Sequence, residues 1–192
     1  MIVHRMLLLL ALTAPCLARA QTPEELVSLY FGAMKSGQTA DIVSHMHPEE
    51  VESFHRATFP VIQEGLEAAA NGEGDPDAFA MKLLLGDDTP ETVLAESPPA
   101  FFGRFLRWVM ALNPAMQAAL SRTDVTVIGS VPEGDTLLHV VYRLRMPMEG
   151  DHMTQMHVMS LKQYEGAWKL MLSGDIQSMS RLFQATPPGL PE

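Results

Sequence analysis

The chain has 192 residues, and its 13 Lys and Arg against 23 Asp and Glu give a formal net charge of −10. This length fits one ordinary domain with its own core. Such an acidic surface repels phosphate groups and anionic lipid, so we expect no nucleic-acid partner and no binding to a membrane surface.

Residues 1–20 are typical of a secretion signal that is removed from the mature protein. Arg5 gives a positive start, Met6 to Ala14 form an apolar run too short to span a membrane comfortably, and Ala18-Arg19-Ala20 fits a cleavage site. We therefore expect cleavage after this site and release into the periplasm, with full secretion as the fallback. A lipoprotein anchored through Cys16 is the alternative. Cleavage would remove this one cysteine, and with it any disulfide or thiolate site.

Helical patterns fill most of the chain up to residue 121. Thr22-Pro23-Glu24-Glu25 predicts a capped helix start, and Gly37 predicts the end of that helix. Pro48 opens a long helix, and Ser97-Pro98-Pro99 precedes the most apolar one. Shorter helices are expected at 39–46 and after the prolines at 76, 90 and 114. The core positions expected in the first and the long helix are Leu26, Leu29, Tyr30, Ala33, Val51, Phe54, Thr58, Val61, Ile62 and Leu66.

The last third of the chain alternates apolar and polar residues and is cut by Gly-containing turns. It predicts four strands, at 123–131, 136–148, 152–164 and 167–173, joined as an antiparallel meander. The expected fold class is therefore α+β, with N-terminal helices packed on a curved C-terminal four-strand sheet. We place this domain at residues 21–184 and expect the Pro-rich residues 185–192 to be a disordered tail.

Two short segments carry a resemblance to a known family. The helix start Met46-His47-Pro48-Glu49-Glu50 and the closing sequence SLKQYEGAWKLML (160–172) resemble the nuclear transport factor 2-like superfamily, and Gly166-Ala167-Trp168-Lys169 is the most recognisable piece. The resemblance covers Thr22 to Pro60 in pattern and Thr123 to Ser173 more fully. It implies a cone-shaped fold, in which the sheet wraps around a helix and leaves a pocket at its open end. The superfamily contains ketosteroid-isomerase-like and polyketide-cyclase-like enzymes and many non-catalytic binding modules.

Strand alternation predicts which side chains face such a pocket. Arg143 and Arg145 mark the outer face of the second strand, and Lys162 marks the outer face of the third. The alternate residues of these strands are therefore expected to point inward. The predicted ligand-binding residues are Tyr142, Gln155 and His157.

The other face of the predicted sheet is also informative. Val141, Met156 and Val158 are expected there, and they are too apolar for a sheet surface that is fully in water. We therefore expect that face to pair with a second copy, as a homodimer, or to be covered by a helix. In the last strand, Trp168 is expected to point inward, into the core.

The inward positions include Tyr142 and His157 but no Asp or Glu, whereas proton-transferring members of the superfamily place an aspartate base in the pocket. We therefore expect a non-catalytic binding or interaction module for a small hydrophobic ligand, with no catalytic residue and no cofactor. The alternative is a lyase- or isomerase-like enzyme with His157 as its base.

A second alternative is a copper-binding protein, because thioether and imidazole groups are soft ligands that suit copper. They occur in His45-Met46-His47 and in the third predicted strand at Met153, Met156, His157 and Met159. Met156 is expected on the opposite strand face from the other three, so these four groups do not converge easily. No metal site is therefore assigned.

Overall fold

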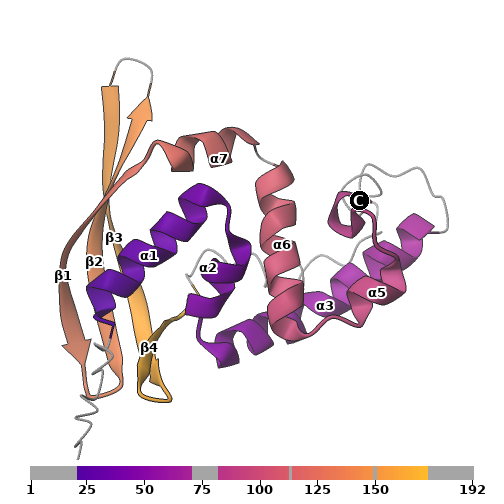
Figure 1. Ribbon diagram of the computed structural model, residues 1–192, viewed down its shortest axis with the longest axis horizontal. Coiled ribbons are helices and arrows are strands. Elements are labelled where there is room, and N and C mark those ends of the chain that lie inside the picture. Colours follow the sequence, from indigo (N-terminus) through magenta and orange to yellow (C-terminus); the bar gives the residue numbers. More distant parts are fainter. Residues whose placement is uncertain (1–20, 71–81, 113, 149–150, 173–192) are drawn as a thin grey trace, which may run out of the picture.

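The computed structural model describes residues 21–70, 82–112, 114–148 and 151–172. The predicted secretion signal, Cys16 and the tail at 185–192 lie outside these residues. The expected fold class is confirmed, because N-terminal helices pack against a four-strand antiparallel sheet (Figure 1). Within the described ranges, no helix is both long enough and apolar enough to cross a membrane.

The helices begin where the sequence places their caps. The Thr22 side chain accepts a hydrogen bond from the Glu25 N–H at 3.1 Å, and the Glu25 carboxylate accepts one from the Thr22 N–H at 3.0 Å. Gly37 ends the first helix with a φ of 68°, a left-handed conformation that glycine adopts at little cost. Residues 82–85 are also helical. The labelled helices are α1 (Pro23–Ser36), α2 (Thr39–His45), α3 (Pro48–Ala70), α5 (Pro90–Leu94), α6 (Pro98–Leu112) and α7 (Pro114–Ser121).

The sheet is a meander in the order β1-β2-β3-β4, with every neighbouring pair antiparallel. A bulge between Val127 and Gly129 interrupts the register of the first pair. Glu165 and Gly166 both have positive φ, at 50° and 78°, as a tight two-residue hairpin turn requires. The strands are β1 (Asp124–Glu133), β2 (Leu137–Met148), β3 (Asp151–Tyr164) and β4 (Ala167–Leu170).

The helices lie in layers on one side of the sheet: α1 is next to the sheet, and α6 and α3 lie farther from it (Figure 1). Helix α1 lies across the sheet and contacts β1, β2 and β4, while α6 packs on both α2 and α3. One continuous core runs through these layers. It joins sheet residues such as Val140 and Leu161 to Phe31 of α1 and to the Phe-rich face of α6.

Most of the predicted helix core is confirmed, with one error in α1. Leu29 was expected inside and is 53% exposed, whereas Val27 and Phe31 are buried. The buried stripe of α1 runs through residues 27 and 31, one turn apart, because the sheet covers that side of the helix. In α3 the expected core residues that the structure buries are Val51, Phe54, Thr58, Ile62 and Leu66.

Candidate functional site

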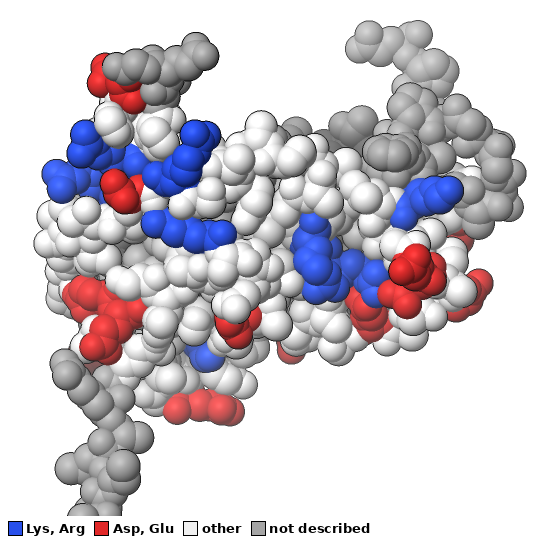
Figure 2. Space-filling model, turned by 45° about the horizontal axis from the view of Figure 1, so that its top comes forward, with Lys and Arg blue, Asp and Glu red and all other residues white. Residues whose placement is uncertain are grey.

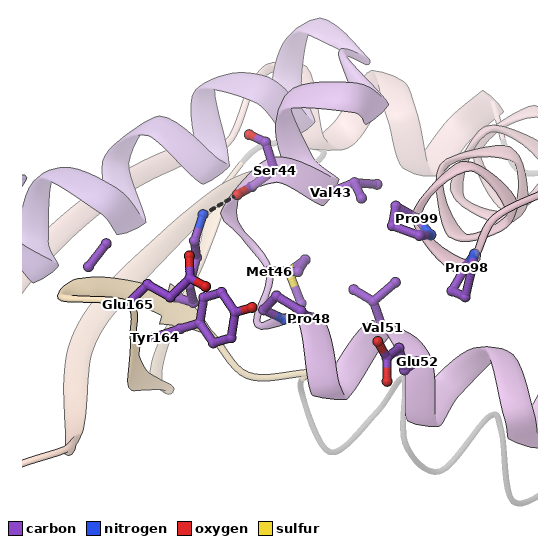
Figure 3. A pocket seen from close by; sticks show the side chains of 12 residues that line it. Val43, Ser44, Met46, Pro48, Val51, Glu52, Pro98, Pro99, Tyr164 and Glu165 are labelled. Atoms are coloured by element: carbon purple, nitrogen blue, oxygen red, sulfur yellow. Dashed lines mark hydrogen bonds between the residues drawn. The ribbon is translucent and has the colours of Figure 1, made fainter.

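A groove of about 530 Å³ lies where the α2–α3 corner, the start of α6 and the β3–β4 hairpin meet (Figure 3). Its size is within the usual range of small-molecule sites. Most of its lining side chains are apolar, and the charged ones are Glu52, Glu165 and Lys169. The apolar and aromatic lining residues are Val43, Met46, Pro48, Val51, Pro98, Pro99, Tyr164 and Ala167.

Local sequence explains how the α2–α3 corner forms one wall of the groove. Pro48 disfavours helical geometry at His47, so α2 cannot continue into α3. The chain is already extended at Met46, the C-cap residue of α2, with φ −77° and ψ 151°. Met46 then forms a parallel β-bridge with Leu170, and the His47 N–H donates to the Leu170 carbonyl at 2.7 Å. This pairing covers the end of β4 at Leu170 and brings the start of α3 beside the β3–β4 hairpin.

Two lysines on the hairpin tie it to the α2–α3 corner. The Lys169 ammonium donates to the Ser44 carbonyl at 2.6 Å, a bond drawn in Figure 3. The Lys162 ammonium donates to the Glu49 carboxylate at 3.0 Å. Both bonds join segments more than a hundred residues apart in sequence, so they help to set the separation of the two walls.

His47 does not line the groove but contacts Tyr164, which does. Its side chain is buried, and its ring meets the Tyr164 ring edge-on at 5.4 Å between centroids. Burial, aided by the nearby Lys162 ammonium, lowers the pKa of His47 below its usual value. The imidazole is therefore neutral near pH 7, and it presents an uncharged surface to Tyr164.

The lining of the groove is mostly apolar and contains few titratable groups. Glu52 and Glu165 are exposed, whereas the ammonium of Lys169 is already bonded to a backbone carbonyl. General acid–base catalysis needs a titratable group aimed at a reacting atom and usually held by a partner. The described lining residues offer a mainly apolar surface beside these charged groups.

The structure brings together the three site residues predicted from the sequence, Tyr142, Gln155 and His157, but it places them away from the groove. Tyr142 is buried. Its ring packs on the Phe31 ring, with 5.1 Å between centroids, and stacks on the His157 ring, with 5.7 Å between centroids. The Nε2 atom of His157 lies 3.1 Å from the Oε1 atom of Gln155, and Gln155 is exposed. The inward direction of Tyr142 and the outward direction of Arg143 agree with the predicted strand phase. None of these three residues lines the groove of Figure 3.

Exposure along β3 explains why Gln155 is not enclosed. Leu161, near the end of the strand, is buried, whereas Met153 and Gln155, near its start, are exposed on the same face. Side-chain direction therefore follows the alternation, but the helices cover only the later part of β3. Alternation predicts direction and cannot predict how far the covering layer extends.

Comparison with protein-family models, with curated proteins and with solved structures gives no significant match. The groove must therefore be interpreted from its own residues.

The thioether and imidazole groups that suggested copper are spread apart. Met46 and His47 are buried at the α2–α3 corner. Met153 pairs with Met146 and Met156 with Arg143, on opposite faces of the sheet. Among the residues that the structure describes, no three His, Cys, Asp or Glu side chains are placed to hold a metal ion.

Sequence reasoning missed the groove. Its lining comes from three segments of the chain, and their signals in the sequence are turn signals: Pro48, Pro98-Pro99 and Glu165-Gly166. Such signals say where the chain turns and not which turns meet. A search for turns rich in proline and aromatic residues would have found the parts, but not their contact.

Proposed function

We propose that this protein is an exported, non-catalytic binding module that holds a small, largely apolar ligand in the groove beside β4. The observation that supports this proposal is the groove itself, whose lining is mainly apolar and whose two carboxylate side chains, Glu52 and Glu165, are exposed. Burial of an apolar ligand there would be favourable by roughly 25 cal/mol per Å² of apolar surface.

The packing around Tyr142 is the second support. Phe31 and His157 contact its ring on the inner side of the sheet, where the resemblance implied an open pocket. A packed ring leaves less room for a substrate beside His157. The group Tyr142, Gln155 and His157 remains the second candidate for the ligand site.

A substitution that fills the groove should block binding. Ala167 is exposed and lines the groove, so Ala167→Trp would occupy part of its volume. We expect it to weaken binding of the neutral fluorescent probe N-phenyl-1-naphthylamine at least about tenfold, the equivalent of about 1.4 kcal/mol. Ala118→Trp, on the exposed side of α7, is the matched control and should leave affinity unchanged. Equal binding by both variants, or no binding by the wild type, would reject the groove as the site.

The enzyme alternative depends on His157. Its recorded polar partner is the Gln155 side chain, an amide that cannot share a proton as a carboxylate does. We expect His157→Gln to fold and to bind the probe as the wild type does. Turnover of a small hydrophobic carbonyl compound by the wild type, lost in His157→Gln while the fold survives, would favour the lyase- or isomerase-like enzyme.

The export proposal rests on the N-terminal sequence. The positive start, the apolar run and Ala18-Arg19-Ala20 favour a cleaved signal and a periplasmic location. Mass spectrometry of the protein from a Gram-negative host should find a mature N-terminus at Gln21. A lipid-modified Cys16 would replace this proposal by a membrane-anchored lipoprotein.

Two further proposals concern relatives and partners. We infer a nuclear transport factor 2-like fold from the sequence Gly166-Ala167-Trp168-Lys169 and from the helix-backed meander, and a cone-shaped sheet in a crystal structure would test it. We also propose that a second copy of the chain covers the outer face of the sheet, because that face leaves Met156 and Val158 exposed.

A further inference from the structure

The two carboxylates of the groove come from different segments and have no recorded partner. Glu52 lies on α3 and Glu165 at the β3–β4 turn, and both side chains are exposed. Between the residues that the structure describes, no hydrogen bond or ion pair uses either carboxylate. In the view of Figure 3 the two side chains lie on different sides of Pro48. A ligand in the groove therefore meets two carboxylates that can accept new partners.

The ammonium group in the lining, by contrast, already has a partner. Lys169 is half-buried and donates to the Ser44 carbonyl at 2.6 Å, so its charge is held against the backbone of α2. The Lys162 ammonium, at the same corner, bonds the Glu49 carboxylate at 3.0 Å and forms a neutral pair with it. Two carboxylates and one ammonium leave the described lining with an excess of one negative charge.

This excess is local to the groove and differs from the overall acidity of the protein. The chain has a formal net charge of −10, yet acidic and basic side chains form separate small groups over the face seen in Figure 2. Attraction by the overall charge would draw a cation to the protein without preference for the groove. Local and overall attraction therefore predict different effects of removing one carboxylate.

We infer that the ligand of this groove is a monocation with an apolar body, a hydrophobic amine that carries one ammonium group. The inference rests on the proposed function and names the chemical class of the ligand. The apolar lining would bury the body, and the carboxylates of Glu52 and Glu165 would attract the ammonium. Tyr164, next to Glu165, adds an aromatic ring, a group that also attracts cations. An anion would meet two repelling carboxylates and would compete with the Ser44 carbonyl for Lys169.

Two pairs of fluorescent probes test the sign of the ligand charge. N-(1-Naphthyl)ethylenediamine carries one ammonium group at neutral pH, and N-ethyl-1-naphthylamine is its neutral analogue. 8-Anilino-1-naphthalenesulfonate is the anionic analogue of the neutral N-phenyl-1-naphthylamine. At low salt the cation should bind about three- to tenfold more tightly than its neutral analogue, since exposed ion pairs are individually weak, and the sulfonate should bind less tightly than its own. Salt at about 1 M, where the Debye length is about 3 Å, should remove most of the cation preference.

Removal of single charges tests whether the groove causes this preference. Glu52→Gln and Glu165→Gln keep the length of each side chain, and each should lower the ratio of cation to neutral affinity about two- to threefold. The double variant should bring the ratio to one or below, because the charge of Lys169 remains. Glu64→Gln, at an exposed position of α3 outside the groove, removes the same overall charge and should leave the ratio unchanged. An equal fall in Glu64→Gln would overturn the inference.

Binding of the neutral probes distinguishes the charge of the ligand from the existence of the site. Neutral probes that bind and that Ala167→Trp weakens, together with a cation that binds no more tightly, would keep the groove as the site and overturn the cationic ligand. A sulfonate that binds more tightly than its neutral analogue would do the same. A cation whose binding Ala167→Trp leaves intact would lie elsewhere on the protein, which also overturns the inference. Failure of both neutral probes to bind the wild type would reject the proposed function and the inference with it.

Discussion

Replacing Arg104 by alanine is expected to lower the free energy of unfolding by about 3 kcal/mol, because the change leaves buried acceptors without a donor. The guanidinium side chain is only 13% exposed and Glu96 only 18%. Arg104 donates to the Glu96 carboxylate at 2.6 and 3.0 Å and to the carbonyls of Leu84 and Leu85 at 3.2 Å. The hydrogen bonds to Glu96 raise the pKa of Arg104, so the side chain is charged at every pH at which the protein folds.

The contact of Arg104 with Asp88, at 2.7 Å, adds little to this loss. Asp88 is about half exposed, and water screens such pairs. The important consequence is structural, because one side chain of α6 holds both the 84–88 segment and Glu96, which lies two residues before α6. Losing it should release residues 82–96 before the rest of the domain unfolds.

Arg107→Ala is the matched control, on the same helix with the same change. Arg107 is exposed, and its recorded bond is one to the Thr39 hydroxyl at 3.1 Å, so we expect a loss under about 1 kcal/mol. Urea denaturation measures both variants, and hydrogen exchange shows whether residues 82–96 lose protection in Arg104→Ala. A loss below about 1 kcal/mol for Arg104→Ala would show that water replaces its bonds without cost.

Patterns that depend on near neighbours in the sequence predicted the structure well. The capping box at Thr22 and Glu25, the end of α1 at Gly37 and the hairpin turn at Glu165-Gly166 all form as expected. Each depends on contacts within a few residues, so a single sequence carries the information. The four-strand meander is predictable for the same reason, since consecutive strands joined by short turns pair with each other.

Features that depend on distant contacts were not predictable in this way. In the sequence, Arg104 looks like an ordinary polar residue of an apolar helix. Its partners in the segment 84–88 are sixteen or more residues away, so no local pattern points to them. The groove depends on Lys169 bonding to Ser44, 125 residues apart. The error at Leu29 has a related cause, because the sequence shows that α1 has an apolar side but not the angle at which the sheet covers it.

Trp168 lies between these two cases. Its side chain packs against the core, as the predicted inward direction requires. It is nevertheless only half-buried, and its partner in β3, Gln163, is exposed. Truncating a fully buried tryptophan lowers the free energy of unfolding by about 3–5 kcal/mol. We do not expect the full loss for Trp168→Ala, because this side chain is only half-buried. A measurable but smaller loss is expected.

Phe54→Ala should lower the free energy of unfolding by about 3–5 kcal/mol, the usual cost of truncating a buried phenylalanine. Phe54 of α3 is 2% exposed, and its ring meets the rings of both Phe102 and Phe105 at 4.9 Å in edge-to-face geometry. Truncation would remove both ring contacts, each worth about 0.5–1.5 kcal/mol beyond its buried area, and would leave a cavity between α3 and α6.

Phe54→Leu separates the ring contacts from the cavity, because leucine fills most of the space but cannot make edge-to-face contacts. We expect it to lose about 1–2 kcal/mol, and its denaturant slope should equal that of the wild type. Urea titrations measure the free energy of unfolding of Phe54→Ala, Phe54→Leu and Trp168→Ala. Phe54→Ala should lose the most, and both other variants should lose clearly less. A loss for Phe54→Ala no larger than that for Trp168→Ala would mean that α3 and α6 can close around the missing ring. In that case the Phe-rich face of α6 would not be the most tightly packed part of the core.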